Sequence, residues 1–298
     1  MDEIIGLDEK IEVLGDGFIW SEGPVWVDNG EFLLFSDAPQ NAIFKWKEGE
    51  GISEYLKPSG YTGSIVRGGE PGSNGLAIDG GGSLILCQHG DRKIARMLVS
   101  TQSPEPIYET LVGTFEGKKF NSPNDLAIHS NGDLYFTDPP YGLVLNMDDP
   151  TKEIPYQGIF RLDTDGEIHL MNKFLSRPNG IAISVNESKI YVGNSDSKSP
   201  TITEFLLDEN GDFNEGNVFF DGSELLKEGL RGSFDGLKVR SDGYIFSTGP
   251  GGVLVLTPTG KHIGTISTGE GTSNCAFDTK ENYLYITADA YLLRIKLK

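Results

Sequence analysis

The stretch Gly232-Ser-Phe-Asp-Gly-Leu-Lys-Val-Arg-Ser-Asp-Gly-Tyr-Ile-Phe246 decides the fold. It predicts a turn at Asp235-Gly236, a short strand, a second turn at Asp242-Gly243 and a second strand, because Asp-Gly pairs favour tight turns between apolar segments. The same order of residue types recurs along the chain. Further copies are Gly72–Leu86, Ser122–Phe136, Arg177–Tyr191 and, less regularly, Thr272–Tyr285 and Ser21–Leu34.

One polar residue in the first turn of each copy marks the period of the repeat. These marker residues are separated by 52, 50, 55, 56 and 39 residues: Glu22, Asn74, Asn124, Asn179, Asp235 and Asn274. Each copy holds about four short strands, and units of this length and content are typical of β-propeller blades. The sequence therefore predicts an all-β fold, a six-bladed β-propeller with four-stranded blades, formed as a single domain over residues 1–298.

The two ends of the chain predict how the ring closes. The sixth copy stops after its third strand, while the alternating stretch at residues 10–14 has no partner beside it. We expect this N-terminal strand to complete the last blade, because closure removes two exposed sheet edges. Long insertions at 58–72, which contains Tyr61, Arg67 and Glu70, and at 138–155 interrupt the repeat. Loops of that length are often functional.

Composition narrows the class of partner. The net charge is -19 at pH 7, with 44 acidic and 25 basic residues, which argues against nucleic acid or an anionic membrane as a partner. Cys87 and Cys275 lie in apolar strands and are expected to be buried free thiols. The N-terminus shows no signal-peptide pattern and no apolar run is long enough to cross a bilayer, so we expect a cytoplasmic protein.

The six marker residues predict a cation site. If the ring closes, their turns meet at one mouth of the central channel, where six oxygen-bearing side chains converge without a basic one. Such a group is unfavourable unless a ligand fills it. Turn geometry alone explains Asn and Asp, but it does not explain Glu22, because Glu is not a favoured turn residue. Carboxylate and amide oxygens suit a hard cation, and calcium takes roughly six to eight oxygen ligands.

Seven motifs carry a resemblance to a known family. They are Ser21-Glu-Gly-Pro-Val-Trp26, Cys87-Gln-His-Gly-Asp-Arg92, Asn121-Ser-Pro-Asn-Asp-Leu126, Tyr135-Phe-Thr-Asp-Pro-Pro-Tyr-Gly142, Arg177-Pro-Asn-Gly180, Phe234-Asp-Gly-Leu237 and Thr248-Gly-Pro-Gly-Gly252. In these motifs the chain resembles the senescence-marker-protein/gluconolactonase/regucalcin family over essentially its whole length. The resemblance implies one catalytic calcium ion at the channel mouth and hydrolysis of a small lactone such as gluconolactone.

The resemblance also implies the metal ligands. Matched motif by motif, they are Glu22, Asn124, Asn179 and Asp235. Calcium is the expected ion, and other divalent cations are alternatives. Phe234 stands where many relatives have Pro, which changes the wall beside one ligand. The insertion at 58–72 prevents a direct transfer of substrate preference.

The expected reaction is metal-assisted ester hydrolysis, in which the cation stabilises the developing oxyanion. Asp235 or Asp125 would activate the attacking water, or Asp235 would attack the carbonyl carbon directly; the sequence leaves both mechanisms open. His89 is equally well explained as a structural histidine. The candidate substrate-binding residues are Asn74, His89, Tyr141 and Arg67.

Two other functions remain open. One is an organophosphate-type hydrolase with the same metal site, similar to diisopropylfluorophosphatase. The other is a non-catalytic, calcium-stabilised propeller that binds a peptide or a sugar, because propellers host many functions. The ligand set favours an enzyme, since a pure scaffold does not need it. The oligomeric state is not predicted.

Overall fold

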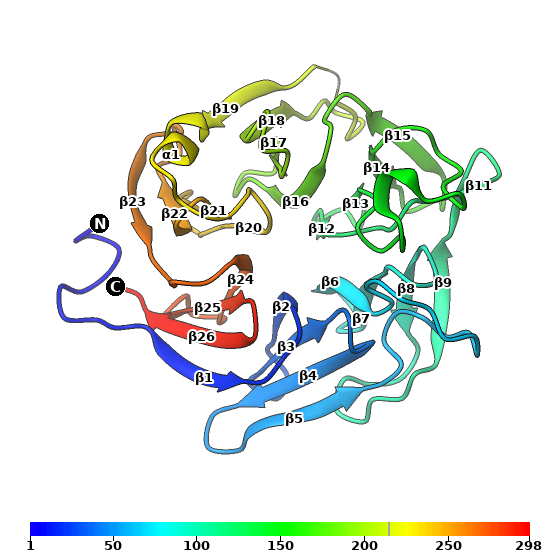
Figure 1. The fold of residues 1–298 in the computed structure, drawn as a ribbon, viewed down its shortest axis with the longest axis horizontal. Helices are drawn as coiled ribbons and strands as arrows, with labels where there is room; N and C mark the ends of the chain where they lie inside the picture. Colours follow the sequence, from blue (N-terminus) through cyan, green and yellow to red (C-terminus); the bar gives the residue numbers. More distant parts are fainter. Residues whose placement is uncertain (214) are drawn as a thin grey trace.

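Six four-stranded antiparallel sheets surround a central axis in the computed structural model, which describes residues 1–213 and 215–298 (Figure 1). This arrangement confirms the predicted six-bladed β-propeller. In every blade the innermost strand contains the marker residue or begins two residues after it, and the following strands step outward. The prediction of a turn at the marker is therefore wrong for blades one, two, four and six, where the marker belongs to the strand.

The strands of the first three blades follow the chain in order. Blade one contains β2 (Ser21–Val27), β3 (Phe32–Asp37), β4 (Ala42–Lys47) and β5 (Gly51–Leu56). Blade two contains β6 (Ser73–Ile78), β7 (Leu84–Gln88), β8 (Lys93–Met97) and β9 (Tyr108–Val112). Blade three contains β12 (Leu126–Ile128), β13 (Leu134–Asp138), β14 (Gly158–Leu162) and β15 (Ile168–Asn172).

The last three blades continue in the same way. Blade four contains β16 (Pro178–Ile183), β17 (Lys189–Asn194), β18 (Thr201–Leu206) and β19 (Asn217–Asp221). Blade five contains β20 (Leu237–Val239), β21 (Ile245–Gly249), β22 (Gly252–Leu256) and β23 (His262–Ile266). Blade six contains β24 (Thr272–Phe277), β25 (Tyr283–Ala288), β26 (Tyr291–Lys296) and, from the other end of the chain, β1 (Glu12–Asp16).

The N-terminal strand closes the ring as predicted, two residues later than the sequence pattern placed it. β1 pairs antiparallel with β26, with Glu12 opposite Arg294 and Asp16 opposite Tyr291. The Arg294 guanidinium also donates to the Glu12 carboxylate over 2.7 Å. Figure 1 shows the two ends of the chain side by side at this blade, so the outer edge of β26 is covered.

An apolar seam lies between each pair of neighbouring blades. Between blades two and three it includes Cys87, Phe136 and Phe160, and between blades six and one it includes Phe35 and Tyr285. Both cysteines are buried free thiols, which confirms the prediction for them. The inner strands enclose a channel of about 430 Å³, lined mostly by aliphatic and aromatic side chains.

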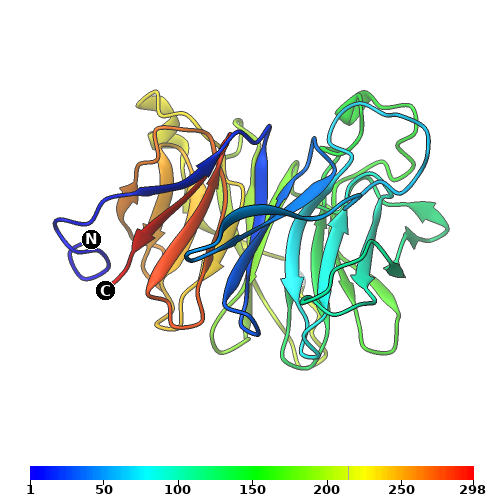
Figure 2. The ribbon, with the colours of Figure 1, turned by 90° about the horizontal axis from the view of Figure 1, so that it is seen from below.

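The remaining short elements belong to the loops. They are the hairpin β10 (Thr114–Phe115) and β11 (Lys118–Lys119), the 3₁₀ turn η1 (Asn146–Asp148) and the helix α1 (Ser223–Lys227). The two long insertions project beside each other from the face where the inner strands begin (Figure 2). In the described parts of the chain, no helix has the length and hydropathy needed to cross a bilayer.

Candidate functional site

Glycines beside the marker residues bring neighbouring blades together at the channel mouth. A methyl group added to Gly23 would lie 2.1 Å from the Asn74 carbonyl oxygen, and one added to Gly75 would lie 2.7 Å from that of Asn124. At this close approach, the Gly75 amide donates a hydrogen bond to the Asn124 carbonyl oxygen over 2.7 Å. Only glycine allows this approach of one backbone to the next. The repeated glycine therefore helps to position the marker side chains at the start of the inner strands.

Local irregularities in the inner strands support this placement. The pairing of β2 with β3 shifts between Glu22 and Val25, and the pairing of β16 with β17 shifts between Pro178 and Ile181. Such bulges redirect a side chain that a regular strand would point into the sheet.

Marker residues line a polar cavity of about 260 Å³ at the mouth of the channel. Six of the predicted site residues and five others line it: Glu22, Asn74, Asn124, Tyr141, Asn179, Asp235, Trp20, Glu70, Arg177, Ser195 and Ser233. All four predicted metal ligands are therefore brought to one cavity.

The Glu22 carboxyl group is almost completely buried. Its oxygens accept hydrogen bonds from the Trp20 indole N–H at 3.2 Å and from the Gly23 amide at 3.0 Å. Burial raises the pKa of Glu22 to about 8, and the charges of Glu70 and Asp125 add to the effect. A carboxylate held this way gains strongly from a nearby cation.

The Asp235 carboxyl group lines the same cavity and is also buried. Loss of solvation raises its pKa well above the usual range for Asp, and the charges of Glu22, Asp125 and Glu70 raise it further. A hydrogen bond from Asn179 opposes the shift without cancelling it. The two carboxylates thus destabilise each other unless a proton or a cation neutralises them.

The two asparagines supply amide oxygens between these carboxylates. The Asn124 side-chain amide donates to Asn179 Oδ1 over 2.6 Å. Asn124 Oδ1 itself is buried and has no hydrogen-bond partner among the described residues. A buried acceptor left unpaired costs about 1–3 kcal/mol, which a ligand cation would recover. Burial, charge and the unpaired oxygen all fit a hard cation bound by Glu22, Asn124, Asn179 and Asp235.

The types of donor atom in the cavity indicate which metal ion fits it. Within residues 1–213 and 215–298, no three His, Cys, Asp or Glu side chains are close enough to hold a metal ion. A site here therefore depends on amide oxygens as much as on carboxylates. This composition suits calcium better than zinc or copper, which favour nitrogen and sulfur.

Asp125 and Asn274 lie near the cavity but do not line it. Asp125 accepts hydrogen bonds from the Leu126 amide at 2.9 Å and from the Asn274 side chain at 3.3 Å, and its carboxylate is 3.8 Å from the Lys238 ammonium. Both side chains turn towards Lys238, which lines the channel below. The structure thus places the predicted alternative base, Asp125, outside the cavity wall.

Tyr141 also lines the cavity. Its hydroxyl group forms a short hydrogen bond with the Ser195 hydroxyl, and the Arg177 guanidinium lies 5.9 Å from its ring centroid. Burial raises the pKa of Tyr141, so the phenol stays protonated. Tyr141 and Arg177 can therefore donate hydrogen bonds to the oxygens of a small polar substrate.

Two predicted substrate contacts lie behind the wall instead. Arg67 donates to the carbonyl oxygen of Gly90 at 2.7 Å and to that of Gly142, which joins the two long loops. His89 is completely buried, with Nδ1 3.5 Å from a Glu70 carboxylate oxygen. Glu70, and not its neighbours Arg67 and His89, reaches the cavity.

Five lining residues were missed as site residues in the sequence analysis. Arg177 and Ser233 each lie two residues before a marker, and Ser195 follows the strand that pairs with an inner strand. Extending each marker by two residues towards the N-terminus would have found Arg177, Ser233 and also Trp20, which lies two residues before Glu22. Glu70 lies in the long loop outside the repeat, so the repeat offers no signal for it.

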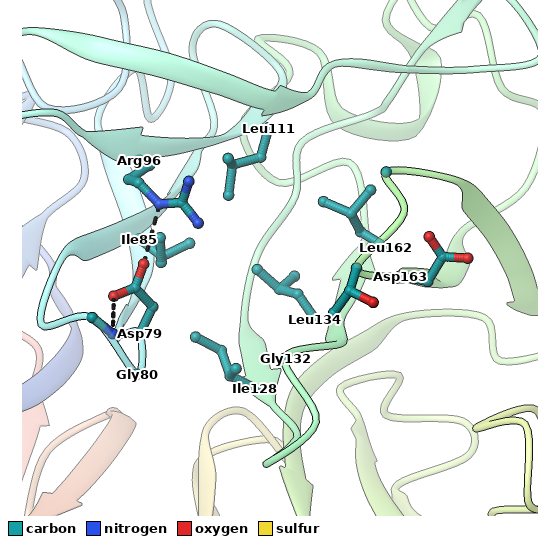
Figure 3. A pocket seen from close by; sticks show the side chains of 13 residues that line it. Asp79, Gly80, Ile85, Arg96, Leu111, Ile128, Gly132, Leu134, Leu162 and Asp163 are labelled. Carbon is teal, nitrogen blue, oxygen red and sulfur yellow. Dashed lines mark hydrogen bonds and ion pairs between the residues drawn. The ribbon is translucent and has the colours of Figure 1, made fainter.

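A second cavity is unsuited to the predicted chemistry. It has a volume of about 460 Å³ and lies between blades two and three, at the turns where the inner strands end (Figure 3). Its wall consists mainly of glycine turns and aliphatic side chains such as Ile85, Leu111 and Leu134. Arg96 is already paired with Asp79 at 3.1 Å. The polar cavity at the channel mouth is therefore the candidate site.

Sequence comparison identifies the family of the chain. Residues 20–290 match the SMP-30/Gluconolactonase/LRE-like region. The chain is 41% identical to a gluconolactonase of Zymomonas mobilis subsp. mobilis, over 100% of this chain and 84% of the relative.

Solved structures give the same result. A gluconolactonase of Xanthomonas campestris is 30% identical, with a TM-score of 0.85, over 100% of this chain and 92% of that one. A calcium-binding regucalcin of Agrobacterium tumefaciens shares the fold at 16% identity, with a TM-score of 0.71 over 97% of this chain and 95% of that one. The full-length match and the common propeller together show that this chain belongs to the SMP-30/gluconolactonase/LRE-like family.

Proposed function

We propose that the protein is a calcium-dependent lactonase that opens a sugar-type lactone such as gluconolactone. The general class, a hydrolase of cyclic ester bonds, rests on the full-length similarity to gluconolactonases. One observation supports the metal: two buried carboxylates, Glu22 and Asp235, share a small cavity with the unpaired oxygen of Asn124. The cytoplasmic location stays a prediction.

The four proposed ligands supply two kinds of oxygen atom to the ion. Glu22 and Asp235 supply the negative charge, while Asn124 and Asn179 supply neutral oxygens. A bound calcium ion would act as a Lewis acid on the lactone carbonyl group. Other divalent cations with a preference for oxygen ligands are alternatives to calcium.

The remaining lining residues are suited to a polyhydroxylated ring. Arg177, Ser195, Ser233 and Asn74 offer hydrogen-bond donors and acceptors around the cavity. Trp20 offers an apolar face beside Glu22, with its N–H already used by that carboxylate. This mixture fits the alternating hydroxyl and C–H groups of an aldonolactone better than an apolar ester.

Asp235 is favoured over Asp125 as the aspartate that acts on the substrate, because Asp235 lines the cavity and Asp125 does not. The two mechanisms considered for Asp235 are removal of a proton from water and direct attack on the carbonyl carbon. In either role Asp235 needs to be ionised, and a cation in the cavity lowers its raised pKa.

A substrate comparison tests the proposal. Calcium-saturated protein should hydrolyse glucono-1,5-lactone and leave an aryl phosphotriester largely unchanged, with acid release as the readout for the lactone. Faster turnover of the phosphotriester would favour the organophosphate hydrolase. Calcium binding without turnover of either compound would favour the non-catalytic binding propeller.

A further inference from the structure

Glu70 is the carboxylate in the cavity that the proposed metal site does not use. Three carboxylates line the cavity: Glu22, Glu70 and Asp235. Glu22 and Asp235 are marker residues, whereas Glu70 comes from the long loop between β5 and β6. The charge of Glu70 contributes to the raised pKa of both other groups, so all three lie close enough to interact.

The Glu70 side chain is also accessible. It is 31% exposed, while His89 behind it is fully buried. Among the described residues, no three His, Cys, Asp or Glu side chains lie close enough together to hold one metal ion. Glu70 therefore does not form a ligand group with Glu22 and Asp235. A water molecule in the cavity can therefore reach an oxygen of Glu70 that holds no ligand.

His89 lies beside the Glu70 carboxylate and does not line the cavity. His89 Nδ1 lies 3.5 Å from Glu70 Oε2, and neither ring nitrogen has a hydrogen-bond partner among the described residues. Leaving such a group unpaired costs about 1–3 kcal/mol, which favours a short movement of Glu70 towards His89. Hydrogen bonds of catalytic groups are often long before substrate binds.

Arg67 holds the loop that carries Glu70. Its guanidinium group donates hydrogen bonds to the carbonyl oxygens of Gly90, which follows His89 in the chain, and of Gly142. Gly142 packs so closely that an added methyl group would lie 2.5 Å from His89 Cβ. The loop, the histidine and the second insertion thus form one connected unit behind the carboxylate.

We propose that Glu70 is the general base and general acid of lactone hydrolysis, positioned by His89 and Arg67. This inference rests on the proposed lactonase function. Asp235 is less suited to this role, because a ligand carboxylate shares its electron pairs with the cation. Tyr141 is unsuited as a base because burial raises the pKa of its hydroxyl group, which stays protonated.

The proton balance of the step is simple. The Glu70 carboxylate takes a proton from water while the water oxygen bonds to the lactone carbonyl carbon. Glu70 then gives that proton to the ring oxygen as the bond between this oxygen and the carbonyl carbon breaks. The products are the open hydroxy acid and the original Glu70 carboxylate, with no other reactant consumed.

Glu70→Gln tests the proposal, since it keeps the shape of the side chain and removes the base. With calcium-saturated protein and gluconolactone, we expect kcat to fall at least about 100-fold, the usual size of general acid–base effects. The KM for lactone and the calcium affinity measured by calorimetry should stay within a few-fold. Added formate should restore part of the activity of Glu70→Ala, because it supplies a carboxylate to the vacated space.

Two more variants separate chemistry from loop anchoring. His89→Asn should lower kcat with little change in KM, because it acts through Glu70. Asp91→Asn is the matched control: Asp91 holds the same loop through the Thr62 amide at 3.1 Å and the Thr62 hydroxyl at 2.6 Å, but does not line the cavity. It should keep near wild-type kcat.

Several outcomes would overturn the proposal. Glu70→Gln with kcat within threefold of wild type, or with only KM raised, would assign Glu70 to substrate binding or to no role. A tenfold loss of calcium affinity in this variant would make Glu70 a ligand instead. If calcium-loaded wild-type protein opens no lactone, the lactonase proposal fails before any variant is made, and this inference fails with it.

Discussion

Gly180 in blade four lies directly against the backbone of Asp235 in blade five. The Gly180 amide donates to the Asp235 carbonyl over 3.0 Å, and a methyl group at Gly180 would sit 2.1 Å from that oxygen. This contact sets Asn179, the neighbour of Gly180, beside the Asp235 side chain. The same glycine that makes a good turn in the sequence is therefore required by contact between two blades.

Replacing Gly180 with Ala should destabilise the protein by about 1–3 kcal/mol, because the added methyl group forces two backbones apart. Urea denaturation of metal-free protein measures this free energy of unfolding. Gly80→Ala is the matched control, since nothing lies within 4 Å of its added methyl group. Equal stability of the two variants would show that the blades do not depend on this close approach.

The Asp235→Asn variant separates metal binding from folding. We expect at least a tenfold loss of calcium affinity and a loss of lactonase activity, because a ligand charge disappears. The melting temperature of the metal-free protein should stay equal or rise, since the substitution removes a carboxylate that burial and Glu22 both disfavour. Activity near wild type with calcium still bound would exclude Asp235 as both base and nucleophile.

Calcium binding should release protons near neutral pH. Burial raises the pKa of Glu22 from 4.5 to about 8, so the metal-free protein holds this proton at pH 7. Because the cation needs the ionised carboxylate, its affinity should increase by up to about tenfold per pH unit from pH 6 to 8. Calorimetry in buffers of different ionisation enthalpy would count the protons released. An affinity independent of pH would contradict the assignment of Glu22 as a ligand.

The raised pKa of Glu22 also makes the stability of the metal-free protein depend on pH. A raised folded-state pKa means that folding favours the protonated form, so stability falls as the pH rises from about 4.5 towards 8. Saturating calcium should remove most of this loss. Thermal melts across this pH range, with and without calcium, measure the difference. In Glu22→Gln the pH dependence of the metal-free melts should be smaller.

Closure of the ring gives a further prediction. Deleting residues 1–16 removes β1 and exposes the edge of β26, so the variant should melt well below wild type and self-associate. Deleting residues 1–11 is the comparison variant, because it leaves β1 in place while it removes Ile4 and the apolar side chains of Met1, Ile5 and Ile11 from the core of blades five and six. Size-exclusion chromatography and thermal melts report both effects. Similar behaviour of the two deletions would show that β1 is not needed for closure.

The repeat was enough to predict the fold and the position of the marker residues. Asp-Gly and Asn-Gly turns occur where chain geometry requires them, so their spacing reports the blades directly. The repeat also predicted that Glu22 and Asp235 lie at one channel mouth, because every inner strand begins on the same face of the propeller.

The directions of individual side chains could not be predicted in the same way. Asn274 occupies a marker position but turns towards Asp125 and Lys238, a choice set by a lysine in another blade. His89 and Arg67 lie behind the cavity because Glu70 takes the place in front of them. Such outcomes depend on contacts between distant loops, and the repeat contains no information about those contacts.

The calcium dependence of lactone hydrolysis tests the central claim most directly. Protein stripped with a chelator should be inactive on gluconolactone, and activity should return on titration with calcium in parallel with binding measured by calorimetry on the same sample. The account predicts that both curves have the same midpoint and that Glu22→Gln shifts them together. Full activity in stripped protein, or calcium binding that leaves the rate of hydrolysis unchanged, would contradict it.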